Sequence, residues 1–339
     1  MDGHLEDGVV RVGGDARQRF YDSRGYGRPL GGSEIALSRV EAAHLLFRDD
    51  LDAVDGTSFR EFLGSIDDPR FGVRFLVYAD LRERGFYLSP AREDWVHSPG
   101  DADFHVYPRG KGPGDGAVAY RVRAVGERAS VPAAALGDCV LAIVDEESEI
   151  TYFETGRPDV AGTSGIDLPE GVPADLLSDR VVCWESPSRL HEQGFYGQPL
   201  AGRDGDTEAL QLSLVEAASL ADRGALDVSG ETTRERGRTV EGERFDRRLG
   251  AYADLRERGV VPKTGFKFGA DFRTYADVES VDDLGHSELL VRVLPGEYAF
   301  SPRDLALDVR LAHGVRKTMT FAQVEGDSVR WLSVERLTP

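Results

Sequence analysis

One octapeptide, Tyr-Ala-Asp-Leu-Arg-Glu-Arg-Gly, occurs twice in this chain, at Tyr78–Gly85 and again at Tyr252–Gly259. Chance does not give two identical runs of this length. The chain therefore holds two copies of one unit, and an internal repeat constrains the fold before any other signal. Residues that both copies keep are candidates for the scaffold, and residues that only one copy keeps are candidates for chemistry.

Further paired segments follow the same order in both copies. The pairs are Gly25–Leu30 with Gly194–Leu200, Ser38–Ala43 with Ser213–Ala218, and Leu141–Phe153 with Phe321–Leu332. Each unit is therefore a complete module with two parts. We divide the chain into the parts 1–67 and 68–155, a linker at 156–175 that is rich in Gly, Pro and Asp, and the parts 176–244 and 245–339.

Each copy has the pattern of an α/β (α+β) module with a small mixed sheet. Apolar spacing predicts helices at 35–47 and 210–221, and short apolar runs predict strands at 9–12 and 181–184. Each octapeptide ends a helix, because Gly85 and Gly259 suit the left-handed position past a helix end. In the second copy we expect strands at 260–261, 271–275 and 289–294, a helix from Ser301-Pro302 to about His313, and a hairpin at 317–324 and 329–334.

The chain has 339 residues and a formal net charge of −19, and its basic residues are almost all arginine. The lysines are Lys111, Lys263, Lys267 and Lys317. An acidic, lysine-poor surface indicates adaptation to high salt, where screening weakens the repulsion between carboxylates. An ordinary acidic cytosolic protein is the other interpretation. Acidity argues only weakly against a nucleic-acid partner, because RNA binding needs no more than a local basic cleft.

Cysteine content and hydropathy exclude several classes of protein. Cys139 and Cys183 are too few for a disulfide framework or a metal cluster. No apolar run approaches the roughly 18 residues of a membrane span. The N-terminus lacks the basic and apolar regions of a signal peptide. We therefore expect a cytoplasmic protein with no membrane association.

The second copy alone carries a further set of motifs after its octapeptide. They are Lys263-Thr-Gly-Phe-Lys-Phe-Gly-Ala-Asp-Phe-Arg-Thr-Tyr275, Gly285-His286-Ser287-Glu288 and Arg310-Leu-Ala-His-Gly-Val-Arg-Lys317. With the octapeptide, they resemble the catalytic region of the archaeal tRNA-splicing endonucleases (tRNA-intron lyases). The resemblance is specific over residues 245–339 and looser over the first copy, as in members with two fused units per chain. The composition is similar to that of haloarchaeal proteins. The resemblance implies a restriction-endonuclease-like second part in each repeat.

The resemblance implies a catalytic triad of Tyr275, His286 and Lys317. Taken singly, a tyrosine at the end of a strand is usually packing, a lone histidine is usually polar surface or satisfied core, and one lysine is usually solvated. The assignment depends on all three residues occurring in order inside matching motifs.

The first copy lacks most of this set. Tyr107 takes the place of Tyr275, and His105 lies two residues before it, out of register. The position of His286 falls within residues 112–116, which contain no histidine, and that of Lys317 falls at Gly137-Asp138. We therefore expect the first copy to be an inactive scaffold.

The family cleaves RNA without a metal or cofactor and leaves a 2′,3′-cyclic phosphate and a 5′-hydroxyl. The resemblance assigns Tyr275 as the base for the 2′-hydroxyl, His286 as the acid for the leaving 5′-oxygen and Lys317 as the electrostatic stabiliser. Histidine suits an acid because its reference pKa is about 6.5. Tyrosine has a reference pKa of about 10 and needs a neighbouring cation to favour its phenolate.

The substrate that the resemblance implies is precursor tRNA with a bulge–helix–bulge, which is cut once at each bulge. Two cuts with local two-fold symmetry need two sites, which a homodimer supplies when each chain has one. In the family, two arginines of one unit clamp a bulge base at the opposite site by cation–π contact. Arg310 fits the first arginine. Arg330 is our choice for the second, and Trp331 beside it also belongs to the expected substrate-binding set. Arg336 is the alternative arginine, and a solvated surface arginine is the other interpretation of each.

The family also joins its halves through an acidic loop of the inactive unit, which inserts into a polar groove of the partner's active unit. Asp145, Glu146 and Glu147 lie in the final hairpin turn of the first copy, where that loop belongs. The other interpretation is a polar turn in an acidic protein.

Two alternative functions stay open at this point. A non-catalytic RNA-binding or structural subunit of a larger endonuclease would have a degraded triad in both copies, and the intact second set argues against it. A metal-dependent nuclease of similar architecture would have a carboxylate followed by Glu-x-Lys. We find no such triplet near Glu288 or Lys317.

Overall fold

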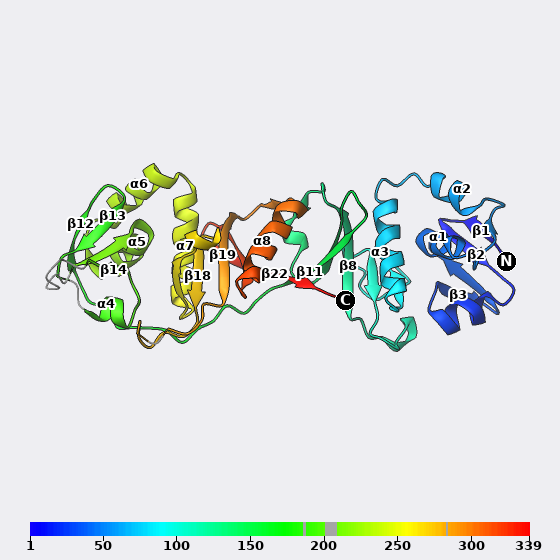
Figure 1. The fold of residues 1–339 in the computed structure, drawn as a ribbon, viewed down its shortest axis with the longest axis horizontal. Coiled ribbons are helices and arrows are strands. Elements are labelled where there is room, and N and C mark those ends of the chain that lie inside the picture. Colours follow the sequence, from blue (N-terminus) through cyan, green and yellow to red (C-terminus); the bar gives the residue numbers. More distant parts are fainter. Residues whose placement is uncertain (186–187, 201–208, 283) are drawn as a thin grey trace. The chain divides into compact units, whose positions relative to one another are not determined.

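The structure is a computed structural model that describes residues 1–185, 188–200, 209–282 and 284–339 (Figure 1). The chain forms two compact units. The first contains Met1–Gly156, Ala299–Ala306 and Arg336–Pro339, and the second contains Arg157–Tyr298 and Leu307–Glu335. The first unit holds the first repeat and two short segments of the second, and the second unit holds the rest of the second repeat. This confirms the predicted α/β fold with two repeats. Among the described residues, no helix combines the length and the apolar character needed to cross a membrane.

The first part of the first unit is a five-stranded sheet with two helices. The strand order is β3 (Arg28–Gly31), β4 (Glu34–Leu37), β2 (Val9–Val12), β1 (Asp2–Glu6) and β5 (Ala53–Val54). The helices are α1 (Arg39–Phe47) and α2 (Phe59–Gly64), and a short π-helical segment spans Arg17–Asp22.

The second part of the first unit is a sheet covered by α3 (Phe71–Glu83). Its strands follow the order β6 (Leu88–Pro90), β7 (Phe104–Val106), β8 (Tyr120–Gly126), β10 (Val140–Val144) and β11 (Ile150–Gly156). The pair β8 and β10 is parallel, and the other pairs are antiparallel. The short strand β9 (Val131–Pro132) pairs with β20 (Ala299–Phe300).

The second unit repeats this plan. Its first sheet has the order β14 (Gln198–Pro199), β15 (Leu210–Ser213), β13 (Arg180–Cys183), β12 (Val172–Leu176) and β16 (Leu226–Asp227), with helices α4 (Ser188–Glu192), α5 (Leu214–Asp222) and α6 (Gly230–Glu241). Helix α7 (Arg244–Glu257) packs on a second sheet of β17 (Val261–Thr264), β18 (Phe272–Tyr275), β19 (Leu289–Pro295), β21 (Thr318–Glu325) and β22 (Ser328–Leu337), and α8 (Pro302–Gly314) precedes β21. Here too one pair, β19 and β21, is parallel.

The region expected to be a linker is partly ordered against the second unit. Gly162 and Ser164 donate backbone N–H groups to the carbonyls of Arg258 and Gly259, and Thr163 donates to Ala276. A Cβ at Gly162 would lie 2.4 Å from the carbonyl oxygen of Gly259, so this close approach requires glycine. The last residues of the expected linker belong to β12.

The two predicted helices at 35–47 and 210–221 are wrong at their starts. Residues Glu34–Leu37 and Leu210–Ser213 are strands, and the helices begin after Ser38 and at Leu214. In each case Ser-x-x-Glu forms a capping box that fixes the turn from strand to helix, and such a box outweighs continuous apolar spacing. Gly85 and Gly259 have φ values of 87° and 74°, as predicted for residues past a helix end.

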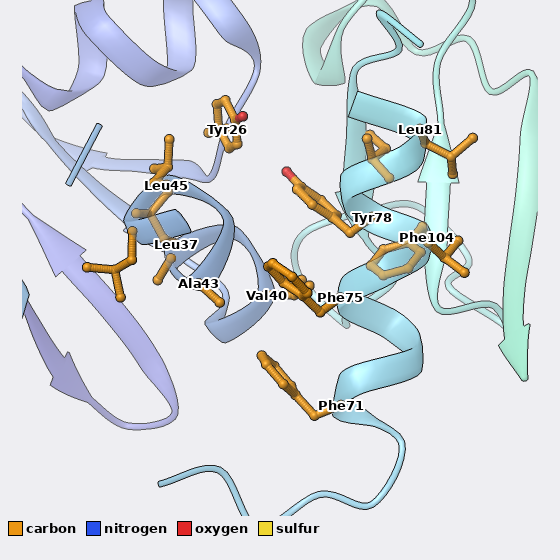
Figure 2. Close-up of a cluster of buried hydrophobic side chains, with 14 of the residues drawn as sticks. Tyr26, Leu37, Val40, Ala43, Leu45, Phe71, Phe75, Tyr78, Leu81 and Phe104 are labelled. Carbon is orange, nitrogen blue, oxygen red and sulfur yellow. The ribbon is translucent and has the colours of Figure 1, made fainter. Parts of the chain in front are cut away.

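The repeated tyrosine joins the two parts of each unit. Figure 2 shows Phe75 and Tyr78 of α3 directed toward α1. The ring of Tyr78 is fully buried, with its centroid 6.4 Å from that of Tyr26 and 5.6 Å from that of Phe104. The ring of Tyr252 is also buried and lies 5.9 Å from that of Phe272. The octapeptide is therefore scaffold.

A buried glutamate at the start of α1 and of α5 holds the preceding loop. In the first unit, Glu41 accepts hydrogen bonds from the backbone N–H of Gly27 at 2.7 Å and from the backbone and hydroxyl of Ser38. Glu216 makes the same contacts with Gly197 and Ser213.

The first arginine of the octapeptide contacts the same loop. Arg82 lies 3.8 Å from the ring centroid of Tyr26 and donates to the carbonyl of Arg24. Arg256 stacks on Tyr196 at the same distance and donates to the carbonyl of Gly194. These shared contacts explain why the arginine is repeated together with the tyrosine.

The two glutamates differ in charge compensation. Burial raises the pKa of Glu41, because its hydrogen bonds and the charge of Arg82 do not outweigh burial and no lysine of the described residues pairs with it. Burial would do the same at Glu216, but the ammonium of Lys263 and the hydrogen bonds from Ser213 and Gly197 outweigh it and lower the pKa to about 2.

These pKa shifts predict opposite effects of pH on the two units. The stability that Glu216 contributes is present above about pH 4.5 and is lost as the pH falls toward 2. The stability linked to Glu41 is present at low pH and is lost as the pH rises through its raised pKa. Glu216→Gln should therefore destabilise α5 more at about pH 6 than at about pH 3, and Glu41→Gln should show the reverse trend in α1. Amide exchange in both helices, corrected for intrinsic rates, measures this; parallel trends would contradict it.

Candidate active site

Three neighbouring strands bring the predicted triad to one edge of the second sheet of the second unit. Tyr275 is the last residue of β18, and Lys317 directly precedes β21. His286 lies three residues before Leu289, where β19 begins. Because β18 is antiparallel to β19 and β19 is parallel to β21, these positions share one edge.

Hydrogen bonds between the residues next to the triad confirm this convergence. The N–H of Glu288 donates to the carbonyl of Thr274 at 3.2 Å, and the N–H of Thr318 donates to the carbonyl of Glu288 at 3.1 Å. The ammonium of Lys317 donates to the carbonyl of Ser287, which directly follows His286. The sheet register therefore brings together the backbone around all three predicted residues.

The side chains differ in their exposure. Tyr275 is 7 % exposed, Lys317 is partly buried, and His286 is exposed to solvent. Burial lowers the pKa of Lys317, and the guanidinium of Arg273 lowers it further. The guanidinium carbon of Arg273 also lies 5.7 Å from the ring centroid of Tyr275. Arg273 therefore stands near the phenol ring and acts on the charge of Lys317.

The ring of Tyr275 packs on a residue of the preceding part of the unit. Its centroid lies 5.7 Å from that of Phe195, and Val261 and Val278 complete this small cluster. The ammonium of Lys263 lies 4.6 Å from the Phe195 ring centroid and donates to the carbonyl of Phe195 at 3.1 Å.

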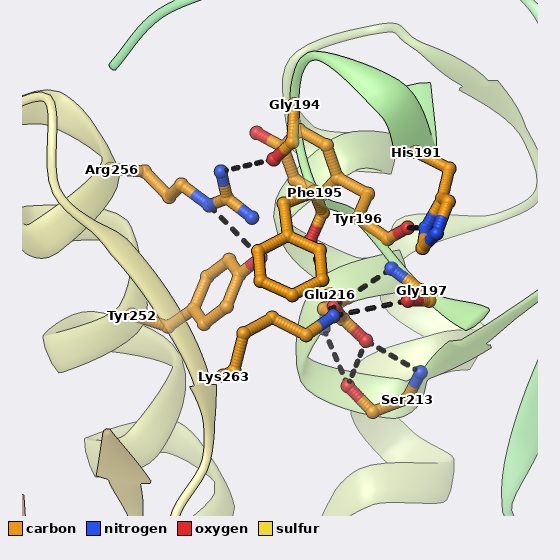
Figure 3. A network of polar contacts seen from close by, with 10 residues as sticks. All are labelled: His191, Gly194, Phe195, Tyr196, Gly197, Ser213, Glu216, Tyr252, Arg256 and Lys263. Carbon is orange, nitrogen blue, oxygen red and sulfur yellow. Dashed lines mark hydrogen bonds and ion pairs between the residues drawn. The ribbon is translucent and has the colours of Figure 1, made fainter. Parts of the chain in front are cut away.

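Lys263 also belongs to the buried network of Glu216 (Figure 3). Its ammonium lies 3.2 Å from Oε1 of Glu216 and donates to the carbonyl of Gly197. Both charged side chains of this pair are largely buried. Lys263 lies inside one of the sequence motifs, but neither it nor Phe195 was predicted to have a role. A position-by-position comparison would have found both, because the first copy has Ser89 and Gly25 there.

The first unit fills the equivalent positions with structural contacts. Leu88 and Pro262 each follow the octapeptide glycine by three residues, so they are equivalent. Leu88 pairs with Val106, and Pro262 pairs with Thr274. The next residues, Tyr107 and Tyr275, are therefore counterparts. The Tyr107 hydroxyl donates to Oγ of Ser89.

The other two triad positions of the first unit lack the functional groups. The strand registers place Ala117, one residue beyond the expected 112–116, at the position of His286. They place Gly137 at the position of Lys317, and its N–H donates to Oγ1 of Thr155. His105 is buried in β7.

The residues expected to bind substrate lie in different places. Arg310 is exposed on α8. Arg330 is exposed, donates to the carbonyl of Gly296 and approaches Glu325. Arg330 pairs with Gln323 of β21, and Gln323 is five residues beyond Thr318 at the triad edge. At about 3.3 Å per residue, Arg330 lies about 17 Å from that edge. Arg336 is exposed near the end of β22.

Trp331 lies in the hydrophobic core of the second unit. It is 8 % exposed, and its indole N–H donates to the carboxylate of Asp254 on α7 at 2.9 Å. This contact holds α7 against the sheet, and the burial leaves little of the ring for a nucleobase. We therefore leave Trp331 out of the proposed substrate-binding set.

A cavity of about 470 Å³ opens between the two parts of the second unit. Its lining includes the cations Arg180, Arg248, Arg273 and Lys263. Arg248 and Lys263 are paired with carboxylates, and Arg180 is 3.7 Å from Asp179. Arg273 forms no ion pair with any described residue, so this wall of the cavity carries uncompensated positive charge.

The acidic turn of the first unit is ordered by its first residue. Oδ1 of Asp145 accepts hydrogen bonds from the N–H groups of Glu147 and Glu149, each at 2.9 Å. Glu146 and Glu147 are exposed, and Glu146 pairs with Arg128. Asp145 therefore shapes the turn, while the next two glutamates present its charge.

Comparison with known proteins agrees with these features. The sequence profile of the tRNA intron endonuclease catalytic C-terminal domain matches residues 245–331. That of the tRNA intron endonuclease N-terminal domain matches twice, at residues 1–63 and 172–237, which agrees with the duplication. Within the described residues, no group of three or more His, Cys, Asp or Glu side chains is placed to hold a metal ion.

Curated relatives match along the whole chain. The tRNA-splicing endonuclease of Natronomonas pharaonis is 63% identical over 100% of both chains, and that of Halobacterium salinarum is 60% identical over 100% of both. The tRNA-splicing endonuclease of Methanococcoides burtonii is 38% identical over 97% of each chain. The chain belongs to the tRNA intron endonuclease family of RNA-cleaving enzymes. Haloarchaeal relatives fit the acidic, lysine-poor composition.

The environment of Lys317 predicts a change in its reactivity. Arg273→Met removes one of the two causes that lower the pKa of this amine, so the amine should hold its proton more strongly. Acetylation of Lys317 by limiting acetic anhydride at about pH 8.5 should then be slower, since only the neutral amine reacts. With four lysines in the chain, peptide mass spectrometry resolves each site, and Lys111 is the internal control. Unchanged or faster labelling of Lys317 would contradict this prediction.

Proposed function

We propose that this protein excises introns from precursor tRNA at bulge–helix–bulge motifs and leaves 2′,3′-cyclic phosphate and 5′-hydroxyl ends without a metal ion. Membership of the tRNA intron endonuclease family is established, and the proposal adds a particular substrate motif and a reaction mechanism. The observation that carries it is the convergence of Tyr275, His286 and Lys317 at one edge of the β18, β19 and β21 ladder.

The side chains suit an acid–base transfer. Tyr275 accepts the proton of the 2′-hydroxyl, and the oxygen of that hydroxyl attacks the phosphorus. His286 gives a proton to the 5′-oxygen as its bond to phosphorus breaks. Lys317 stands beside the phosphorane, where negative charge increases, and Arg273 adds positive charge near the phenol. Fixed cations in a partly closed site stabilise such charge more strongly than mobile ions in water.

The precursor tRNA substrate is inferred from the relatives, whose names describe tRNA-splicing endonucleases. One complete triad per chain requires two chains for two cuts, so we propose a homodimer. Arg310 and Arg330 then serve the site of the partner subunit, and the distance of Arg330 from the triad edge of its own unit fits that role. Exposed guanidinium groups stack well on splayed bases.

The acidic turn of the first repeat is the proposed dimer contact. Glu146 and Glu147 carry its exposed charge, and the cavity of the second repeat offers Arg273 without an ion-pair partner among the described residues. We propose that the turn of one chain enters this cavity in the partner subunit. Ion pairs formed inside a cavity are screened less by salt than those on an open surface.

Substitution of the triad should remove cleavage and spare binding. Lys317→Ala and His286→Ala should each lower the single-turnover rate on an intron-containing precursor by roughly 10² to 10³-fold, while the affinity for the precursor stays within about threefold. Lys111→Ala and His313→Ala, at exposed positions, are the matched controls. Equal loss of rate and affinity in the triad variants would reject the assigned roles.

The reaction products test the chemistry itself. In excess chelator, the wild-type protein should cleave at an undiminished rate, and mass spectrometry should find a cyclic phosphate on each upstream fragment. Loss of cleavage in chelator, or ends with a 5′-phosphate, would favour the metal-dependent alternative.

Removal of charge from the acidic turn should dissociate the dimer. Glu146→Gln with Glu147→Gln keeps the Asp145 hydrogen bonds that shape the turn, so the change acts on charge alone. We expect monomers by light scattering. Glu325→Gln with Asp327→Asn, in the equivalent turn between β21 and β22, is the matched control and should stay dimeric. A dimer that persists with Glu146 and Glu147 neutralised would refute the proposed contact.

A further inference from the structure

Phe195 has a backbone conformation that its counterpart in the first repeat reaches with glycine. Gly25 has a φ of 66° and Phe195 has a φ of 51°. The two positions are equivalent, because Arg82 and Arg256 donate to the carbonyls that precede them. A bulky residue in the left-handed region is strained, whereas glycine is not. Such strain is kept only where the surrounding structure enforces it, and it is concentrated at functional sites.

The strained residue contacts the proposed base. The Phe195 ring is 8 % exposed and packs on the ring of Tyr275. The ammonium of Lys263 holds Phe195 through its carbonyl and lies against the face of its ring. Glu216 in turn fixes this ammonium (Figure 3). A continuous set of contacts therefore runs from the start of α5 to Tyr275.

The first repeat lacks this set and arranges its rings differently. The counterpart of Lys263 is Ser89, which accepts the hydrogen bond of Tyr107. Above Gly25 lies the ring of Tyr87, 3.0 Å from the place of a Cβ, so a side chain there would press against this ring. In the second repeat the counterpart of Tyr87 is the smaller Val261, which leaves room for a ring on Phe195.

The presence of Lys263 in place of Ser89 also changes the hydrogen bonding of the tyrosine hydroxyl. In the first repeat it is bonded to Ser89, whereas Lys263 directs its amine to Glu216 and to two backbone carbonyls. The Tyr275 hydroxyl forms no hydrogen bond with any residue that the structure describes. The second repeat thus holds the ring by packing and leaves the hydroxyl for a ligand.

We propose that Phe195 and Lys263 are positioning residues that hold Tyr275 in its cleaving orientation, which makes the N-terminal part of the second repeat a component of the active site. The proposal rests on the proposed role of Tyr275 as base. Phe195 supplies the surface on which the phenol ring rests, and Lys263 fixes Phe195 in its strained conformation. Neither residue exchanges a proton with the RNA.

Two substitutions at Phe195 separate positioning from stability. Phe195→Ala removes the ring and keeps the strained backbone, whereas Phe195→Gly removes the ring and relieves the strain. Both should lower the single-turnover cleavage rate on precursor tRNA by on the order of 10²-fold at saturating enzyme, with unchanged binding. The Phe195→Gly variant should have a higher melting temperature than the Phe195→Ala variant, because glycine relieves the backbone strain. If the rate instead follows the melting temperature, Phe195 is only structural and the proposal is wrong.

A double-mutant cycle tests whether Phe195 acts through Tyr275. In the Tyr275→Phe background, Phe195→Ala should cause no further loss of rate, because the group that it positions is absent. A multiplicative loss would overturn the proposal. Wild-type cleavage by Tyr275→Phe alone would instead reject the assigned base, so the two failures are distinguishable.

Lys263 is tested in the same way. Lys263→Ser, the residue of the first repeat, should lower the rate of the wild-type chain and have no further effect in the Phe195→Ala chain. Leu226→Ala, a buried change in the same part of the unit, is the control for stability and should lower the melting temperature with an unchanged rate. A rate loss of equal size in Leu226→Ala, or an undiminished rate in Lys263→Ser, would contradict the role of Lys263.

Discussion

The fold of each unit depends on one buried glutamate that begins a helix and binds the loop before it. Glu41 and Glu216 each accept two hydrogen bonds from a single serine and one from a glycine N–H, and Glu216 accepts a fourth from Lys263. A buried carboxylate is stable only when such donors compensate for lost water. The octapeptide arginine, Arg82 or Arg256, then stacks on the tyrosine of the same loop, Tyr26 or Tyr196. Loop, helix start and octapeptide helix therefore form one interlocked structure, and this explains why the octapeptide is identical in both copies.

The second unit adds a cation to this scaffold and thereby connects it to the triad edge. Lys263 lies in β17, whose neighbour β18 ends at Tyr275, so the residue that neutralises Glu216 also stands one strand from the phenol. A buried ion pair of this kind contributes little net stability, because desolvation offsets the attraction. Its value is geometric, since three acceptors fix the ammonium at one point. The carbonyl of Phe195 is one of them.

The sequence was sufficient for the duplication, the helix ends at Gly85 and Gly259, and most strands of the second sheet. It failed where a local hydrogen-bond motif overrides periodicity: Ser38 and Ser213 turn a continuous apolar pattern into a strand followed by a helix. It also could not foresee contacts that depend on tertiary packing. Trp331 was expected to bind substrate together with Arg330, but strand alternation turns the indole toward α7. The convergence of the triad depends on strand order and on one parallel pair, neither of which apolar spacing determines.

The first copy, which we propose to be inactive, differs from the second by more than missing side chains. The hydroxyl of Tyr107 is hydrogen-bonded to Ser89, and the N–H of Gly137, at the lysine position, is hydrogen-bonded to Thr155. The ring of Tyr87 fills the space above Gly25. Each contact satisfies a polar group or fills a void that the active copy leaves for substrate or for positioning. A histidine and a lysine placed in the first copy would therefore meet a tyrosine that is already hydrogen-bonded and lacks an aromatic support from the preceding loop. We therefore propose that cleavage depends on the side chains packed around the tyrosine as well as on the triad itself.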